Sequence, residues 1–133
     1  MLESVSWIVE GRIAMAEFSG ALTLNDFVQV KEHLTSFIPR EHPRPFYIIY
    51  NTSARTGMDW RLSDLGHVRD LGYTHPRLRR IVVVDAKPHP LASVVGRMAV
   101  HFHGLSVQIT RSQEEALAHL YQIDPMLRTS LPR

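Results

Sequence analysis

The chain has 133 residues, of which 44% are hydrophobic and 21% charged, and its formal net charge is +2. These values are typical of one globular domain with its own core, and the small charge does not indicate a nucleic-acid partner. The absence of cysteine excludes disulfides, thiol nucleophiles and cysteine-ligated metals. Residues 1–5 do not begin a secretory signal, and no apolar run approaches the roughly 20 residues that span a bilayer. We therefore expect a cytoplasmic protein without membrane insertion.

The first third of the chain predicts a β-hairpin followed by a helix. Gly11 lies between predicted strands near residues 7–10 and 12–19, where it supplies the turn. Thr23 and Asp26 then form a capping-box pattern that opens a helix. Its apolar residues recur at helical spacing and predict one buried stripe: Phe27, Val30, Leu34, Phe37 and Ile38.

The stretch from residue 45 to 51 is predicted to be the central strand. Phe46 to Tyr50 are five consecutive apolar or aromatic residues, a pattern that suits a strand covered on both faces. The polar residues Asn51, Thr52 and Ser53 follow directly. Because open α/β sheets place functional loops at the carboxyl ends of their strands, we expect a functional edge here.

The remaining chain alternates helices and strands. Strands are predicted near residues 80–85 and 105–110, each preceded by a helix. A capping box at Ser112–Glu115 opens a last helix, and residues 126–133 are expected to form a flexible tail. This alternation predicts an α/β fold in one domain of residues 1–125: a mixed, mostly parallel five-stranded sheet with an N-terminal hairpin and four helices mainly on one face.

Over residues 5–125 the sequence resembles the STAS domain, the SpoIIAA-like fold of bacterial anti-sigma-factor antagonists. The matching segments are Gly20–Asp26, Asn51–Ser53 after the central strand, and the Ser112–Leu120 helix. The resemblance implies strands that neighbour one another in chain order. It also implies a non-enzymatic regulatory module that binds a protein partner or, in some members, a small ligand, with no cofactor required.

Relatives in this family that are regulated by phosphorylation carry an Asp-Ser-Ser-Gly-like motif at the start of the second helix. Its place here falls on Asp59-Trp60-Arg61-Leu62, where only the aspartate matches. We therefore expect no regulatory phosphoacceptor serine at this position. Phosphorylation of the neighbouring Ser53 or Thr56 would contradict that expectation.

The predicted contact surface is the loop from Asn51 to Arg61 with the start of the next helix. It would bind a protein partner or a second copy of the chain, with Trp60 as its anchor, because tryptophan is over-represented among interface hot spots. The candidate residues are Asn51, Thr52, Ser53, Arg55, Thr56, Asp59, Trp60 and Arg61.

Two other readings stay open at this stage. The first is a carrier of a small apolar ligand, with a pocket against the predicted helix that carries Leu91, Val95, Met98 and Phe102. The second is a hydrolase built on Ser53, Asp85 and His89, although the sequence has no Gly-x-Ser-x-Gly elbow.

Metal and nucleic-acid sites are not predicted. His101 and His103 are two residues apart, so they point in different directions on a helix and cannot chelate one ion from one face. The basic run Arg77–Arg80 lacks the interleaved aromatic residues of a nucleic-acid surface, and a solvated strand end explains it better.

Overall fold

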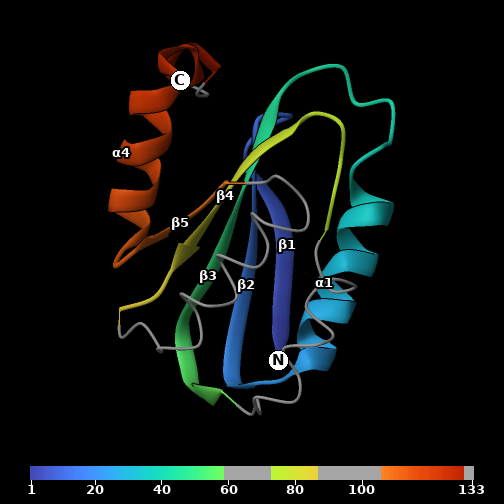
Figure 1. The fold of residues 1–133 in the computed structure, drawn as a ribbon, viewed down its shortest axis with the longest axis vertical. Coiled ribbons are helices and arrows are strands. Elements are labelled where there is room, and N and C mark those ends of the chain that lie inside the picture. Colours follow the sequence, from blue (N-terminus) through green and yellow to red (C-terminus); the bar gives the residue numbers. More distant parts are fainter. Residues whose placement is uncertain (59–72, 87–105, 131–133) are drawn as a thin grey trace.

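The computed structural model describes residues 1–58, 73–86 and 106–130 (Figure 1). These residues form one five-stranded sheet in the order β1-β2-β3-β4-β5. β1 runs antiparallel to β2, and the other neighbouring strands are parallel. The strands are β1 Leu2–Val9, β2 Ile13–Leu22, β3 Phe46–Met58, β4 Leu78–Val84 and β5 Ser106–Thr110. The predicted mixed, mostly parallel sheet with a central strand at Phe46 is confirmed.

The helices of the described residues lie on both faces of the sheet. Helix α1, Leu24–Phe37, covers one face, while helix α4, Gln113–Ile123, covers the other (Figure 1). The prediction of four helices mainly on one face also concerns residues 59–72 and 87–105, which lie outside the described residues. Helix α4 lies on the face of the sheet opposite α1, whereas the prediction placed the helices mainly on one face.

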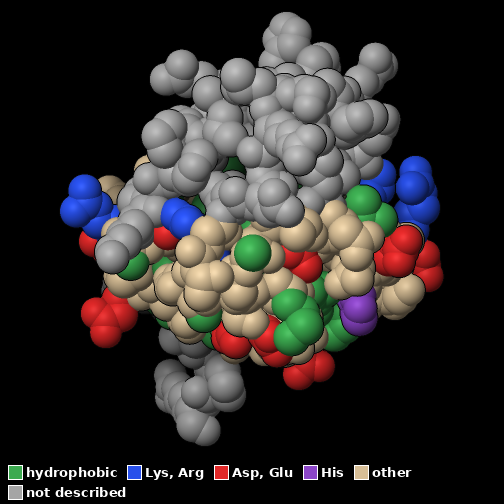
Figure 2. All heavy atoms as spheres, turned by 90° about the horizontal axis from the view of Figure 1, so that it is seen from below, with side chains coloured by type: hydrophobic (Ala, Val, Ile, Leu, Met, Phe, Trp, Pro, Cys, Tyr) green, Lys and Arg blue, Asp and Glu red, His purple; other side chains and the backbone are tan. Residues whose placement is uncertain are grey.

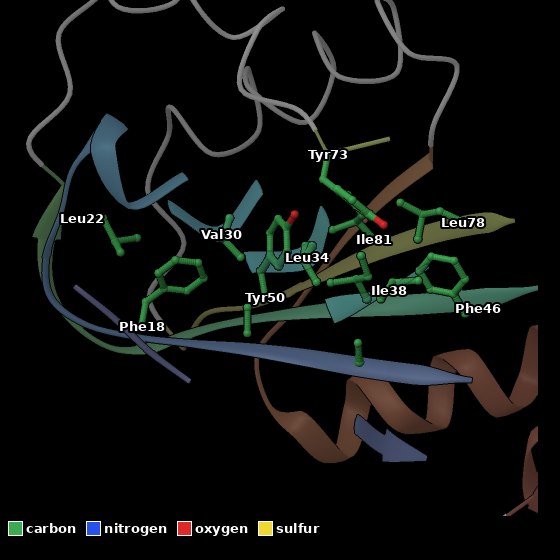
Figure 3. Close-up of a cluster of buried hydrophobic side chains, with 13 residues drawn as sticks. Phe18, Leu22, Val30, Leu34, Ile38, Phe46, Tyr50, Tyr73, Leu78 and Ile81 are labelled. Atoms are coloured by element: carbon green, nitrogen blue, oxygen red, sulfur yellow. The ribbon is translucent and has the colours of Figure 1, made fainter. Parts of the chain in front are cut away.

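Alternation along β3 divides the core into two clusters. Phe46, Ile48 and Tyr50 face α1, whereas Tyr47 and Ile49 face α4, and all five side chains are buried. Figure 3 shows side chains from β2, α1 and β3 converging in the α1-side cluster. The α4-side cluster is completed by residues of the hairpin, β4 and the C-terminal region: Val9, Ile13, Met15, Val82, Val84, Ala116, Leu120 and Leu127.

The helix starts confirm the capping signals. At α1, the Thr23 backbone N–H donates to the Asp26 carboxylate at 2.8 Å, and the Thr23 hydroxyl accepts from the Asp26 N–H at 3.3 Å. At α4, the Ser112 hydroxyl accepts from the Glu115 N–H at 3.1 Å. The Glu115 carboxylate reaches the N–H of Arg111 instead of that of Ser112. Both helices thus begin where backbone donors find side-chain acceptors.

β3 is longer than predicted, and this changes the nature of the expected contact loop. The segment Asn51–Met58 continues the strand and pairs with the Glu17–Leu22 part of β2. It was predicted as a loop because its residues are small or polar. β2 itself runs to Leu22 instead of ending near residue 19, so its backbone offers β3 a partner along this extension.

The packed chain also extends beyond the predicted domain end at residue 125. Pro125–Ser130 forms a short 3₁₀-helix, η2, in which Leu127 is completely buried against the α4-side cluster. The flexible tail expected at residues 126–133 stays a prediction, and its residues 126–130 belong to η2. Met126, Leu127 and Leu131 are too few apolar residues to form a periodic pattern that would reveal the burial of Leu127.

A polar cluster ties the start of β3 to the end of α4. The Arg12 guanidinium lies 2.9 Å from the Asp124 carboxylate, and the Tyr47 hydroxyl donates to the same oxygen at 3.0 Å. Arg12 also donates to the carbonyl of Pro45. Burial, together with the hydrogen bond to Asp124, raises the pKa of the Tyr47 phenol. Three distant parts of the chain are fixed together at this point.

His119 of α4 should make folding stability depend on pH. The Arg80 guanidinium donates to its Nε2 at 2.8 Å, so this nitrogen is the acceptor of a neutral imidazole. Burial and the charge of Arg80 lower the pKa of His119 below its usual 6.5. The unfolded chain therefore binds this proton more readily than the folded one. The free energy of unfolding should be at its full value above about pH 6.5 and fall as pH drops below it.

Urea unfolding at a series of pH values checks this prediction. The variant His119→Gln keeps an acceptor for Arg80 but cannot titrate, so its stability should fall less steeply with acidification than that of the wild type. His33→Gln, a matched change on the exposed face of α1, should follow the wild-type profile. Parallel profiles for the wild type and His119→Gln would show that His119 contributes nothing to acid sensitivity.

Candidate functional site

The carboxyl ends of β3, β4 and β5 lie side by side and define what we call the carboxyl edge. It consists of Asn51–Met58 in β3, Asp85 directly after β4, and Thr110 at the end of β5. Figure 2 views the molecule from this end. The expected functional edge of the sheet therefore combines polar groups from three strands.

An ion pair joins two neighbouring strands at the carboxyl edge. The Arg55 Nε lies 2.6 Å from the Asp85 carboxylate, and the two side chains are only 12% and 7% exposed. Because a mostly buried charge is costly without its partner, this pair favours one fixed arrangement of the two strand ends. Arg55, predicted as a residue of the contact surface, is thus engaged inside the protein.

Two buried threonines complete the hydrogen bonding of the carboxyl edge. The Thr52 hydroxyl donates to the carbonyl of Val84 at 2.9 Å, across the β3–β4 pair. The backbone N–H of Asp85 donates to the Thr110 carbonyl at 2.9 Å. The Thr110 hydroxyl is placed within 3.4 Å of the Val83 carbonyl. These groups join β3, β4 and β5 and are used for structure.

The remaining candidate residues differ in exposure. Ser53 and Thr56 have exposed side chains on β3, and Asn51 is half-buried, with its Oδ1 accepting from the Ser53 N–H at 3.1 Å. Thr52 is buried. The candidates Asp59, Trp60 and Arg61 lie outside the described residues, and their role stays a prediction.

The hydrolase reading finds no support at the carboxyl edge. The Asp85 carboxylate is bound by Arg55, whereas a catalytic triad needs it on a histidine. Ser53 is exposed, and His89 lies outside the described residues. Nearby, burial raises the pKa of Tyr73 to about 12. The pKa of Tyr50 is also raised, mainly by burial and to a smaller extent by repulsion from the ionised form of Tyr73. Both phenols are protonated at neutral pH, so neither supplies a base.

The residues of the predicted apolar-ligand pocket, Leu91, Val95, Met98 and Phe102, lie outside the described residues, and that pocket stays a prediction. Within residues 1–58, 73–86 and 106–130, no group of three or more His, Asp or Glu side chains could hold a metal ion. Among the helices of this part of the chain, none is long and apolar enough to cross a membrane.

Sequence reasoning missed the ion pair although it singled out both of its members. Arg55 and Asp85 are 30 residues apart, and each was assigned a different role. The positions of the two residues relative to the predicted strands could have revealed the pair. Both residues follow apolar strand cores that become neighbours in a parallel sheet, so an arginine and an aspartate at these ends are placed to meet.

Comparison with known proteins identifies the fold. No protein-family model and no curated protein matches the chain. Among solved structures, it is similar to an uncharacterized DUF3478-family protein with a SpoIIAA-like fold from Shewanella loihica PV-4. The two chains are 16% identical, 90% and 92% of their lengths are covered, and the TM-score is 0.56.

Two structures of SpoIIAA also match. The unphosphorylated form of this anti-sigma factor antagonist is 18% identical, with 92% of this chain and 96% of that chain covered and a TM-score of 0.48. For the phosphorylated Bacillus form the identity is also 18%, the coverage is 90% and 99%, and the TM-score is 0.49. The SpoIIAA-like fold predicted from the sequence is confirmed by the match to the Shewanella protein.

Proposed function

We propose that this protein is a non-enzymatic regulatory module of the STAS type, acting in the bacterial cytoplasm by binding a protein partner. Its contact surface is the carboxyl edge, extended by the proposed anchor Trp60 and its neighbours Asp59 and Arg61. A second copy of the chain is the alternative occupant of the same surface. The protein shares a SpoIIAA-like fold with the uncharacterized Shewanella protein, and the sequence resemblance associates this fold with regulatory modules.

The observation that carries the proposal is that the buried polar groups of the carboxyl edge bind other groups of the protein. Arg55, Asp85, Thr52 and Thr110 bind one another or backbone carbonyls, and so build a rigid edge. A catalytic centre instead leaves a nucleophile and a base free to face a substrate. What this edge offers to solvent is a stretch of paired strand that carries Ser53 and Thr56. Such a surface suits contact with another protein.

A bulky charged side chain at Thr56 should block the partner. The variant Thr56→Arg places a long cation on the exposed face of β3, so we expect the affinity for the partner to fall at least about tenfold. The partner is obtained by affinity capture from the native host, and its binding to purified wild-type and variant protein is then measured by calorimetry.

Gln122→Arg provides the control, because it adds the same side chain to an exposed position on α4. It should bind the partner as the wild type does. Analytical ultracentrifugation of the wild type and Thr56→Arg covers the case in which the partner is a second copy. Unchanged partner affinity and unchanged self-association in Thr56→Arg would contradict the proposed surface.

A further inference from the structure

Three connections meet at the end of the sheet opposite the carboxyl edge. They are the turn at residues 10–12, the loop at 39–45 and the loop at 73–77, which all lie where the parallel strands begin (Figure 1). We call this region the amino end. The backbone N–H of Phe46 donates to the carbonyl of Arg77 at 3.0 Å and that of Tyr47 to the carbonyl of Arg12 at 2.8 Å.

Two histidines hold these connections in one arrangement. His42 donates from Nε2 to the Gly11 carbonyl at 2.8 Å and stacks on Trp7, with ring centroids 5.6 Å apart. His75 bonds through Nε2 to the Pro39 carbonyl at 2.8 Å, while its Nδ1 accepts from the Arg77 N–H at 3.0 Å. The His75 ring also lies edge-on to Phe46, 4.9 Å between centroids. These contacts therefore fix the backbone of the loops that carry the exposed side chains of the amino end.

The exposed charges of the amino end are mostly positive, and every cation is an arginine. The exposed ionisable residues of these connections and of the first residues of β4 are Glu10, Arg40, Glu41, Arg44, Arg77 and Arg79. At the carboxyl edge, acidic side chains show over the described part of the surface, and Lys and Arg side chains lie at its margins (Figure 2). The exposed charged side chains at the described strand and helix ends there are Glu3, Arg111, Glu114 and Glu115, of which three are acidic. The two ends of the sheet thus differ in charge.

We propose that the amino end is a second interaction surface, which binds an acidic segment of a partner protein. The planar guanidinium group can donate two parallel hydrogen bonds to one carboxylate, which a lysine ammonium cannot do. Because the loops are cross-linked by His42 and His75, little ordering is needed when a segment binds. Arg77 supplies the carbonyl of the Phe46–Arg77 hydrogen bond, and Arg44 precedes Phe46 by two residues, so these two exposed arginines are the proposed main contacts.

A protein segment fits the amino end better than a nucleic acid does. Single-stranded nucleic acids bind through aromatic side chains on which their bases stack. Among the described residues of this end, the aromatic side chains of Trp7, Phe46 and Tyr73 are half-buried or buried in the core. Glu10 and Glu41 also interrupt the positive surface, and they would repel a continuous phosphate backbone.

Binding of a fluorescein-labelled octaglutamate peptide to the full chain tests the proposal. We expect the peptide to raise fluorescence anisotropy at low ionic strength, with binding that weakens as salt is added. The double variant Arg44→Glu/Arg77→Glu should bind it at least about tenfold more weakly, because both contacts change from attraction to repulsion. Circular dichroism confirms that this variant is folded.

Arg111→Glu is the matched control for the single variants Arg44→Glu and Arg77→Glu, since each reverses one exposed arginine and Arg111 lies between β5 and α4, at the other end of the sheet. It should bind octaglutamate as the wild type does. An equal loss in Arg111→Glu would show attraction by net charge alone and overturn the proposal. So would the absence of peptide binding, or tighter binding of a labelled octauridylate, which would indicate a nucleic-acid surface. Thr56→Arg, at the carboxyl edge, should leave peptide binding intact, so this test is independent of the proposed function.

Discussion

Truncating either isoleucine in the centre of β3 should cost the protein a large part of its stability. We expect Ile48→Ala and Ile49→Ala each to lower the free energy of unfolding by about 2–5 kcal/mol, the usual range for an isoleucine in a packed core. Both side chains are completely buried, Ile48 in the α1-side cluster and Ile49 in the α4-side cluster. A cavity on either face of the central strand removes contacts that the neighbours cannot restore.

The comparison of these two variants tests whether β3 is covered on both faces. Urea denaturation gives the free energy of unfolding and its slope for each variant. Ile123→Ala is the control, because it makes the same chemical change at a residue that is 42% exposed at the end of α4. Its cost should stay near about 0.5 kcal/mol. If only one of the two β3 variants exceeds the control, the strand is covered on one face alone.

The two-sided burial of β3 is also the feature that the sequence predicts best. Phe46 to Tyr50 are five consecutive apolar or aromatic residues that do not alternate with polar ones, so both faces of the strand are expected to be buried. The same residues then require helices on both sides. Periodicity identified the buried stripe of α1, but a stripe does not say which face of the sheet it meets. That choice depends on the connections, and α4 lies on the face opposite α1.

The carboxyl edge was predictable in position but not in structure. Asn51, Thr52 and Ser53 were expected to be functional because they end an apolar run. Their strand conformation comes from pairing with β2, a contact between residues more than 30 positions apart, such as Glu17 and Asn51. Propensity acts locally, whereas β pairing is decided by the neighbouring strand. For the same reason, the roles of Arg55 and Asp85 depend on which strands become neighbours.

Removing one member of the Arg55–Asp85 pair should be more damaging than removing both. In Asp85→Ala the Arg55 guanidinium, only 12% exposed, loses the carboxylate 2.6 Å from its Nε. We expect the free energy of unfolding to fall by about 2–4 kcal/mol, slightly under the range for fully buried pairs because Arg55 keeps some contact with water. Urea denaturation measures this change.

The double variant Arg55→Leu/Asp85→Leu separates the charge effect from the packing effect. Two leucines fill the space between β3 and β4 without leaving a charge in a mostly dry site, so this variant should be more stable than Asp85→Ala. A loss in the double variant as large as the losses of Arg55→Leu and Asp85→Leu added together would mean that the residues act independently. If the double variant is stable and still binds the protein partner, the pair shapes the carboxyl edge without touching that partner. If it is stable but no longer binds, the pair itself belongs to the contact surface, even though its side chains are nearly hidden from solvent.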